Sequence, residues 1–226
     1  MKDISPHLAD VFFIKTRYNL IMKTYFSLAS LSIILPSLIL AGCATEPTAT
    51  TPTMPGTPNQ VMPAKDRQQA LLDLKTWNIS GKVAIHSNTD SITASLSWQQ
   101  SYGNYTISLF GPLGTNSLTL KGQPGKVILE SSDGKKAIAN TPEQLVAQQS
   151  GWKLPISNLY YWVRGLPAPN SSAQKSYDPY HRLTQLTQAG WQIQFLSYTT
   201  AHGIDLPTKI FMNHSGLNIK IIITEW

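Results

Sequence analysis

Apolar and polar side chains alternate along much of this chain, and the alternation narrows the possible folds more than any other feature. It is strictest over residues 92–99, where Ile92, Ala94, Leu96 and Trp98 alternate with polar residues. A period of two sends successive side chains to opposite faces of a strand, so one face is buried while the other meets water. The pattern therefore predicts an antiparallel sheet with one apolar face.

Turn residues divide the alternating stretches into about ten strands. Asp133-Gly134 is a strong hairpin signal, and Ser215-Gly216 separates the last two strands. Strands and helices do not alternate along the chain, which argues against a parallel sheet. The expected strands cover residues 77–85, 92–99, 105–109, 118–120, 127–131, 136–139, 182–187, 191–198, 208–214 and 217–226.

Three segments have helical spacing instead. Residues 64–75 place apolar side chains on one face, and residues 155–163 do the same before Gly165. The third begins at Thr141, a capping residue followed by a proline at the first helical position. Residues 167–177, rich in Pro and Ser, are expected to form a loop. The class predicted is α+β, mainly β, with helices laid against one face of the sheet.

The single cysteine, Cys43, lies in a recognisable processing signal. Met22-Lys23 opens a short basic region, residues 26–40 are apolar, and Leu40-Ala41-Gly42 directly precedes the cysteine. The apolar stretch is short for a membrane-spanning helix and contains a proline. This is the pattern of a bacterial lipoprotein signal. It predicts removal of residues 1–42, with N-acylation and a diacylglycerol thioether at Cys43.

Two further expectations come from the neighbouring residues. Asp3 and Asp10 are atypical of a signal's basic region, which favours Met22 as the true start of translation. Ala44 follows the cysteine, in place of the Asp that resembles an inner-membrane retention signal, so the expected location is the periplasmic side of the outer membrane. Residues 43–63 are rich in Pro and Thr and are expected to be a flexible tether. Residues 64–226 are expected to form one domain.

Charge and motif searches exclude several classes of function. The formal net charge is +6, of which +4 remains after removal of residues 1–42, and the basic residues do not cluster. A modest positive charge favours an acidic partner or membrane phosphates, without a nucleic-acid signature. The sequence contains no G-x-S-x-G, H-E-x-x-H or nucleotide-binding P-loop motif. No enzyme, metal site or cofactor is therefore predicted, apart from the covalent lipid.

Three histidines are candidates for a catalytic base or a metal ligand. Asp178 could orient His181 as a base, but the intervening Pro179 and the lack of a paired nucleophile favour an ordinary loop histidine. His86 and His214 fall at strand ends near turns, where a solvent-exposed side chain is the more common outcome.

Several short strings occur together in one order. They are Trp77-Asn78-Ile79-Ser80-Gly81-Lys82, Ser97-Trp98-Gln99-Gln100, Gly111-Pro112-Leu113-Gly114, Tyr160-Tyr161-Trp162-Val163-Arg164-Gly165-Leu166-Pro167, Gly190-Trp191-Gln192-Ile193, Leu206-Pro207-Thr208-Lys209 and Lys220-Ile221-Ile222-Ile223. Each string alone is weak, but their order and spacing over residues 66–226, together with the signal before Cys43, resemble the LolB family of outer-membrane lipoprotein receptors and insertion factors.

The resemblance implies a curved antiparallel sheet of about 10–11 strands, forming an incomplete barrel whose open side is plugged by about three helices. It also implies an apolar cavity between sheet and helices, which accepts the acyl chains of lipoproteins from the periplasmic carrier LolA. The chain would act as a monomer and incorporate that cargo into outer-membrane lipid. It would use neither catalysis nor nucleotide.

The resemblance assigns membrane insertion to a loop formed by Gly111, Pro112, Leu113 and Gly114. A leucine is unusual at the tip of a Pro/Gly turn, where polar residues are common. An exposed leucine forgoes about 1.5–3 kcal/mol of burial, which contact with the acyl region of a bilayer would restore. The alternative is a leucine folded back onto the core.

The alternation also selects candidates for the cavity lining, each of which could equally be ordinary core. They are Ile92, Leu96, Trp98, Ile107, Leu109, Phe195, Ile219 and Ile221 on the sheet, with Trp152, Tyr160 and Trp162 on the helical side. Two other functions stay open: a lipid-anchored scaffold for another envelope lipid or component, and a tethered hydrolase with a site of scattered residues.

Overall fold

The computed structural model describes residues 61–112, 117–169 and 171–226, all within one compact unit of the chain. Eleven strands form a single antiparallel sheet in the order β6-β5-β4-β3-β2-β1-β11-β10-β9-β8-β7. The strands are β1 (Thr76–His86), β2 (Ser91–Ser101), β3 (Asn104–Phe110), β4 (Ser117–Gln123), β5 (Lys126–Ser131), β6 (Lys136–Ala139), β7 (Ala173–Tyr177), β8 (Leu183–Gln188), β9 (Trp191–Ala201), β10 (Ile204–His214) and β11 (Leu217–Glu225).

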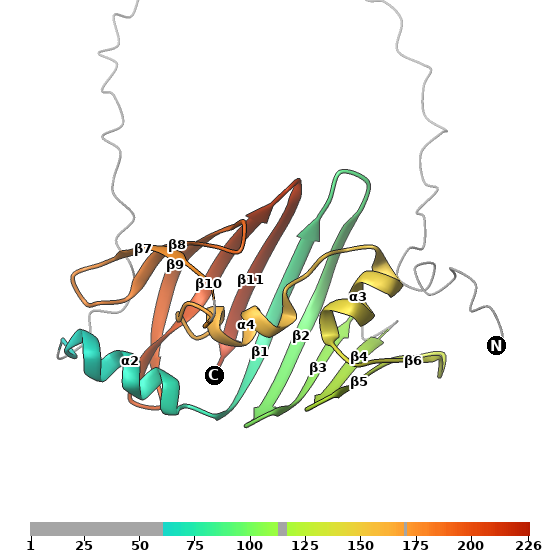
Figure 1. Ribbon diagram of the computed structural model, residues 1–226, viewed down its shortest axis with the longest axis horizontal. Helices are drawn as coiled ribbons and strands as arrows, with labels where there is room; N and C mark the ends of the chain where they lie inside the picture. The colour runs from blue at the N-terminus through green and yellow to red at the C-terminus, as the bar shows by residue number, and fades with distance from the viewer. Residues whose placement is uncertain (1–60, 113–116, 170) are drawn as a thin grey trace, which may run out of the picture. The chain divides into compact units, whose positions relative to one another are not determined.

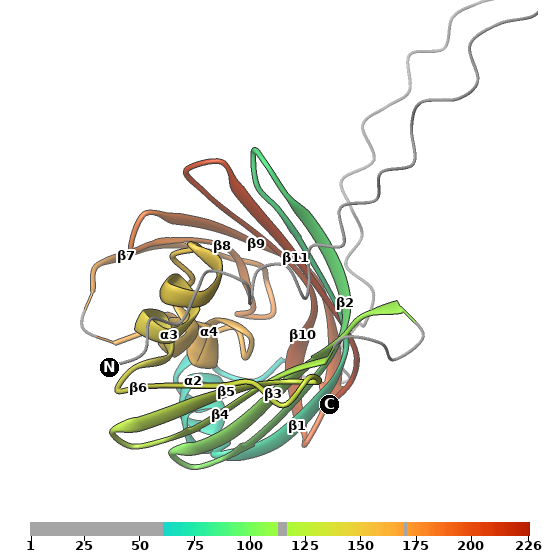
Figure 2. The same ribbon diagram turned by 90° about the vertical axis from the view of Figure 1, so that its right-hand side faces the viewer.

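The sheet is strongly curved and does not close into a barrel. In the part of the chain that the structure describes, β6 and β7 are the two edges and do not pair with each other. Figures 1 and 2 show the sheet bending around two short helices, α3 (Pro142–Ser150) and α4 (Ile156–Trp162), on its concave side. A third helix, α2 (Ala64–Asp73), precedes β1. The predicted open half-barrel with three helices is confirmed.

The alternation predicted from sequence is seen in the burial of the central strands. In β2, Ala94, Leu96 and Trp98 are buried, while the residues between them face solvent or are half-buried. The chain pairs β1 with β11 as well as with β2, so the first and last strands lie side by side at the centre of the sheet. Because both ends of the domain contribute central strands, the fold requires the whole of residues 76–225.

Gly81 lies where β1 passes close to the backbone of β11. A Cβ atom at this position would lie 2.0 Å from the carbonyl oxygen of Ile222, and the register between the two strands shifts between Ser80 and Gly81. A side chain larger than hydrogen would push the two central strands apart. The glycine is therefore needed for the bulge that joins the two halves of the sheet.

One strand was not predicted. Residues 167–177 were expected to form a loop, but Ala173–Tyr177 pairs with β8 as the edge strand β7. Its residues after Ala173 are all exposed, so the strand has no buried face. The sequence therefore lacks the apolar alternation that would have predicted a strand here. Strand β10 also begins earlier than expected, at Ile204, because it continues through Pro207 by a local shift of register.

Candidate functional site

An apolar cavity of about 150 Å³ lies between the concave face of the sheet and the segment containing α3 and α4. Strands β1 to β5 form its floor, and residues 146–156 form its roof. The lining residues are Ile85, Ile92, Ile107, Leu109, Leu118, Leu120 and Leu129 from the sheet, with Val146, Gln149, Ser150, Trp152, Leu154 and Ile156 from the roof. Eleven of these thirteen side chains are apolar.

The register of the strands explains why the floor is continuous. Ile107 of β3 lies opposite Leu120 of β4, and Leu120 lies opposite Leu129 of β5, so one apolar row crosses three strands. A second row joins Leu109 to Leu118. Side chains opposite each other in an antiparallel pair point to the same face, so both rows face the helices.

Several floor residues are not fully covered. Ile92, Ile107, Leu109 and Leu118 are half-buried, whereas Leu120 is only 5% exposed. Leucines and isoleucines on the inner face of a sheet are normally packed against another layer, because burying each one stabilises the fold by about 1.5–3 kcal/mol. Their partial exposure shows that the roof leaves a hollow above β2 to β4 which the protein does not fill with its own side chains.

The roof is held together by local hydrogen bonds. Thr141 caps α3 by accepting a bond from the backbone N of Gln144, and Gly151 ends the helix in the left-handed conformation. The Ser150 hydroxyl donates to the carbonyl of Val146 (2.9 Å) and accepts from the backbone N of Trp152 (3.2 Å). Ser150 is thereby satisfied within its own turn, which leaves Gln149 as the lining polar residue with a side chain able to meet a guest.

The size of the cavity sets a limit on what it can hold. An enclosed apolar cavity of about 150 Å³ accepts a guest of about the size of benzene, and this partly open cavity has a similar volume. That is enough for a short stretch of one acyl chain. Admitting several complete chains would require residues 146–156 to move away from the sheet.

The structure places four of the eleven cavity candidates in this lining: Ile92, Ile107, Leu109 and Trp152. The other seven pack elsewhere in the same core cluster: Leu96, Trp98, Tyr160, Trp162, Phe195, Ile219 and Ile221. Trp162 is fully buried and donates from Nε1 to Gln188 (2.9 Å), and Trp98 donates to Gln100 (3.1 Å). Both tryptophans pack in the core cluster and do not line the hollow.

Nine lining residues were not selected from the sequence. Four of them follow the same alternation as the predicted residues, and only the strand register shows that they line the cavity. They are Ile85, Leu118, Leu120 and Leu129. In the insertion loop, Gly111 is buried and Pro112 is exposed, while Leu113 and Gly114 lie outside the described residues. Cys43 and the tether up to residue 60 also lie outside them.

The histidines make local contacts. The Nδ1 atoms of His86, His181 and His214 lie 2.8–3.0 Å from Ser91 Oγ and the carbonyls of Met62 and Gly190, respectively. Asp178 binds Arg182 through its side chain (2.7 Å). Across the described ranges, no group of three His, Cys, Asp or Glu residues could hold a metal ion. Within the same ranges, no helix is both long and apolar enough to cross a membrane.

Comparisons with known proteins agree on one family. The family model described as "Outer membrane lipoprotein LolB" matches residues 75–226. The chain is 38% identical to the outer-membrane lipoprotein LolB of Coxiella burnetii (strain RSA 493 / Nine Mile phase I) over 199 residues, covering 87% of this chain and 91% of the relative. It is 42% identical to that of Pseudomonas fluorescens (strain Pf0-1) over 188 residues, covering 83% and 90%.

A more distant likeness is found among solved structures. A LolA superfamily protein from Nitrosomonas europaea has 9% sequence identity and a TM-score of 0.42, covering 70% of this chain and 91% of that protein.

Proposed function

This chain belongs to the LolB family of outer-membrane lipoproteins, and on that premise we propose that its cavity receives the acyl chains of other lipoproteins and releases them into the outer membrane. The chain is itself an outer-membrane lipoprotein that serves lipoprotein localisation. The observation that carries the proposal is the hollow above β2 to β4, because its floor is apolar and incompletely covered.

Graded apolar affinity can drive such a transfer without chemistry. Each methylene moved from water into an apolar site is worth about 0.8 kcal/mol, so a stretch of ten is worth about 8 kcal/mol. Passage of a free acyl chain through water is therefore very unfavourable, while passage from one apolar site to another is not. The sequence contains no P-loop for nucleotide binding. We therefore assign the chain a binding and transfer role that is not enzymatic and needs no cofactor.

The proposed donor of the cargo is LolA, the soluble carrier of the periplasm. The resemblance to the LolB family motivates this partner, and the apolar cavity supplies a site of compatible chemistry. Direct hand-over would require the two cavities to face each other, so that the acyl chains remain shielded from water. In this arrangement the roof formed by residues 146–156 would open toward the carrier, because the strands of the floor are held in place by pairing within the sheet.

The remaining parts of the proposal concern the membrane. Acylation of Cys43 would anchor the chain, residues 44–63 would tether residues 64–226 to the periplasmic face, and the loop Gly111–Gly114 would present Leu113 to the bilayer. The described base of this loop supports an outward position, since Pro112 is exposed and Phe110 is 36% exposed. Phe110 lies at the end of β3, where its exposed ring could contact a membrane.

A reconstituted transfer assay tests the proposal. The full chain in liposomes is mixed with LolA carrying a radiolabelled lipoprotein, and cargo in the liposome fraction is measured over time. The Leu109→Phe variant should reduce transfer at least tenfold, because the larger ring fills the cavity. The control Ile222→Phe enlarges a half-buried side chain on the opposite face of the sheet and should transfer normally.

Two results would contradict the proposal. If the Leu109→Phe variant transfers cargo as fast as the unmodified chain, transfer does not depend on the cavity. Binding of a free fatty acid without any uptake of lipoprotein would instead favour a scaffold for another envelope lipid.

A further inference from the structure

A second pocket, of about 360 Å³, lies apart from the apolar cavity, between α2 and the hairpin of β7 and β8. Its lining comes from three parts of the fold: the first turns of α2, the segment 165–167 after α4, and residues of β7 and the turn that follows it. None of its lining residues belongs to the apolar cavity. The pocket is therefore a separate site.

The polar lining of this pocket is basic. Lys65 and Arg67 come from α2, Lys175 from β7 and His181 from the turn before β8, whereas no Asp or Glu is among the lining residues that the structure describes. Between described residues, neither lysine forms an ion pair. Three permanent positive charges thus line one hollow, and the described part of its wall contains no carboxylate, which favours an anionic guest.

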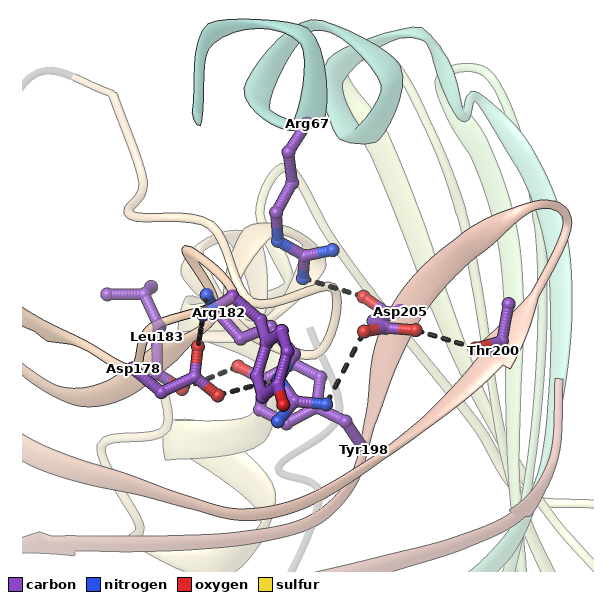
Figure 3. Close-up of polar contacts among 8 residues, drawn as sticks. Arg67, Asp178, Arg182, Leu183, Tyr198, Thr200 and Asp205 are labelled. Carbon is purple, nitrogen blue, oxygen red and sulfur yellow. Dashed lines mark hydrogen bonds and ion pairs between the residues drawn. The ribbon is translucent and has the colours of Figure 1, made fainter. Parts of the chain in front are cut away.

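Arg67 is the part of the site that is fixed most firmly. Its side chain is buried, with only 5% of the residue exposed, and Nη2 donates to the backbone carbonyl of Asp205 (2.6 Å). Figure 3 shows Arg67 descending from α2 toward Asp205. Its guanidinium also lies 5.8 Å from the centre of the Tyr198 ring. A guanidinium carries five donors, so one neutral acceptor leaves most of its donor capacity unused.

The nearby carboxylates are already committed to another arginine. Asp178 accepts from Arg182 Nε at 2.7 Å, and Asp205 lies 3.4 Å from Arg182 Nη1. Asp205 also accepts from the Thr200 hydroxyl (2.6 Å), as Figure 3 shows. Burial lowers the pKa of Arg67, an effect only partly opposed by the charges around it. Asp178 and Asp205 are paired with Arg182 and so neutralise Arg67 only in part. An anion in the pocket would supply the negative charge that Arg67 lacks.

The start of α2 adds further donors on the same side. The residue before the helix is Pro63, which provides no side-chain cap, and Ala64, Lys65 and Arg67 of the first turns all line the pocket. Backbone N–H groups in the first turn of a helix point along its axis and attract oxyanions. Phosphate has several charged oxygens and needs donors from more than one direction, which this combination of helix and basic side chains provides.

From these observations we propose that the pocket between α2 and β7 binds a phosphate oxyanion, with Lys65, Arg67 and Lys175 as its ligands. The phosphate could belong to a lipid headgroup or be free in the periplasm. The headgroup source rests on the proposed function, in which residues 44–63 tether α2 to the membrane. A chain of about twenty residues spans at most about 70 Å in any conformation, so anchoring at Cys43 would keep the pocket within that distance of the membrane.

The test uses the full chain in dodecyl maltoside micelles and titration calorimetry at constant ionic strength. The probes are inorganic phosphate and glycerophosphoglycerol, the water-soluble headgroup of phosphatidylglycerol. The double variant Lys65→Gln/Lys175→Gln should bind at least tenfold more weakly than the unmodified chain. Both lysines are exposed, so folding should persist. The control Lys75→Gln/Lys126→Gln removes the same charge from exposed positions outside the pocket and should bind normally.

The outcomes separate the alternatives. Binding of glycerophosphoglycerol supports a lipid headgroup as the source, and binding of inorganic phosphate alone supports free phosphate. No binding of either probe, or equal binding by both double variants, overturns the proposal. A fluorescent fatty acid added to the same samples reports on the apolar cavity independently. Its binding should be the same in all three proteins, so a failure of the cavity proposal would be distinguishable from a failure of this one.

Discussion

Glu143 of α3 accepts a hydrogen bond at Oε1 from the backbone N of Ser157 in α4, at a distance of 2.7 Å. The two residues lie on either side of the segment that forms the roof of the apolar cavity, and the bond satisfies an N–H in the first turn of α4. Ser157 follows directly after the lining residue Ile156. The contact therefore ties together the two helices that flank the roof of the cavity.

Removing this contact should make the roof looser. We expect Glu143→Ala to lower the free energy of unfolding by about 1 kcal/mol, the usual contribution of one such bond. We also expect it to accelerate uptake of a fluorescent fatty acid several-fold. Urea denaturation and stopped-flow fluorescence measure the two effects. Gln148→Ala changes an exposed residue of the same helix and should leave both unchanged. Identical uptake rates in the two variants would show that α3 and α4 do not gate the cavity.

Tyr105 should show an unusual dependence on pH. Its hydroxyl is buried without a hydrogen-bond partner among the described residues, and burial, followed by the charge of Glu143, raises its pKa from about 10 to about 12. A raised pKa means that the folded state favours the protonated phenol, so its contribution to stability is complete below pH 10 and is lost as the pH rises through about 12.

The Tyr105→Phe variant removes both the unpartnered hydroxyl and its titration. We expect it to match or exceed the unmodified chain in stability at neutral pH by up to about 1 kcal/mol. It should also lose less stability between pH 10 and 12. Tyr102→Phe, at an exposed position, is the control. Urea unfolding at several pH values provides the measurement, and superimposable curves for Tyr105→Phe and the unmodified chain would refute the assignment.

The buried charges around Arg182 should be more important for stability than any exposed ion pair. Its side chain is 2% exposed, and the carboxylates of Asp178 and Asp205 are nearly as well covered. Because Arg182→Leu would leave two buried carboxylates without this cation, we expect a loss of about 3–5 kcal/mol. Lys121→Gln breaks an exposed pair with Glu130 and should leave the free energy of unfolding nearly unchanged, because solvent screens the pair. Comparable losses in the two variants by urea denaturation would contradict this account.

The insertion loop can be tested although Leu113 lies outside the described residues. We expect Leu113→Glu to leave acceptance of cargo from LolA unchanged but to reduce its delivery to liposomes at least tenfold, because a carboxylate is costly in an apolar membrane interior. Leu113→Ile keeps an apolar side chain and should deliver normally. Transfer of a labelled lipoprotein separates the two steps. Normal delivery by Leu113→Glu would mean that the loop plays no part in insertion.

The parts of the fold that could be predicted from the sequence are those in which burial of one face makes apolar and polar residues alternate. The central strands alternate because one face packs on the core, so their residues could be predicted together with the open half-barrel. Strand β7 lacked this signal: it lies at the edge of the sheet, and its residues after Ala173 are all exposed. A strand held mainly by its pairing with one neighbour leaves little trace in hydrophobic pattern.

The cavity was harder to predict than the sheet. Leu109 and Trp98 both occupy inward positions on neighbouring strands, yet Leu109 lines the hollow and Trp98 is packed beneath other residues. Alternation reports which face a side chain is on, but both a filled core and an empty cavity require apolar residues there. What separates them is the position of α3 and α4 over the sheet, which depends on contacts distant in sequence such as that between Trp162 and Gln188.

Locating a bound acyl chain on the protein tests directly whether the apolar cavity receives it. A lipoprotein carrying a photoreactive diazirine in one acyl chain is bound to the full chain and irradiated, and the modified residues are identified by mass spectrometry. We expect adducts on residues that line the apolar cavity, such as Leu109, Leu118 and Trp152. Adducts confined to the outer face of the sheet, at Lys82 or Phe211, would contradict it.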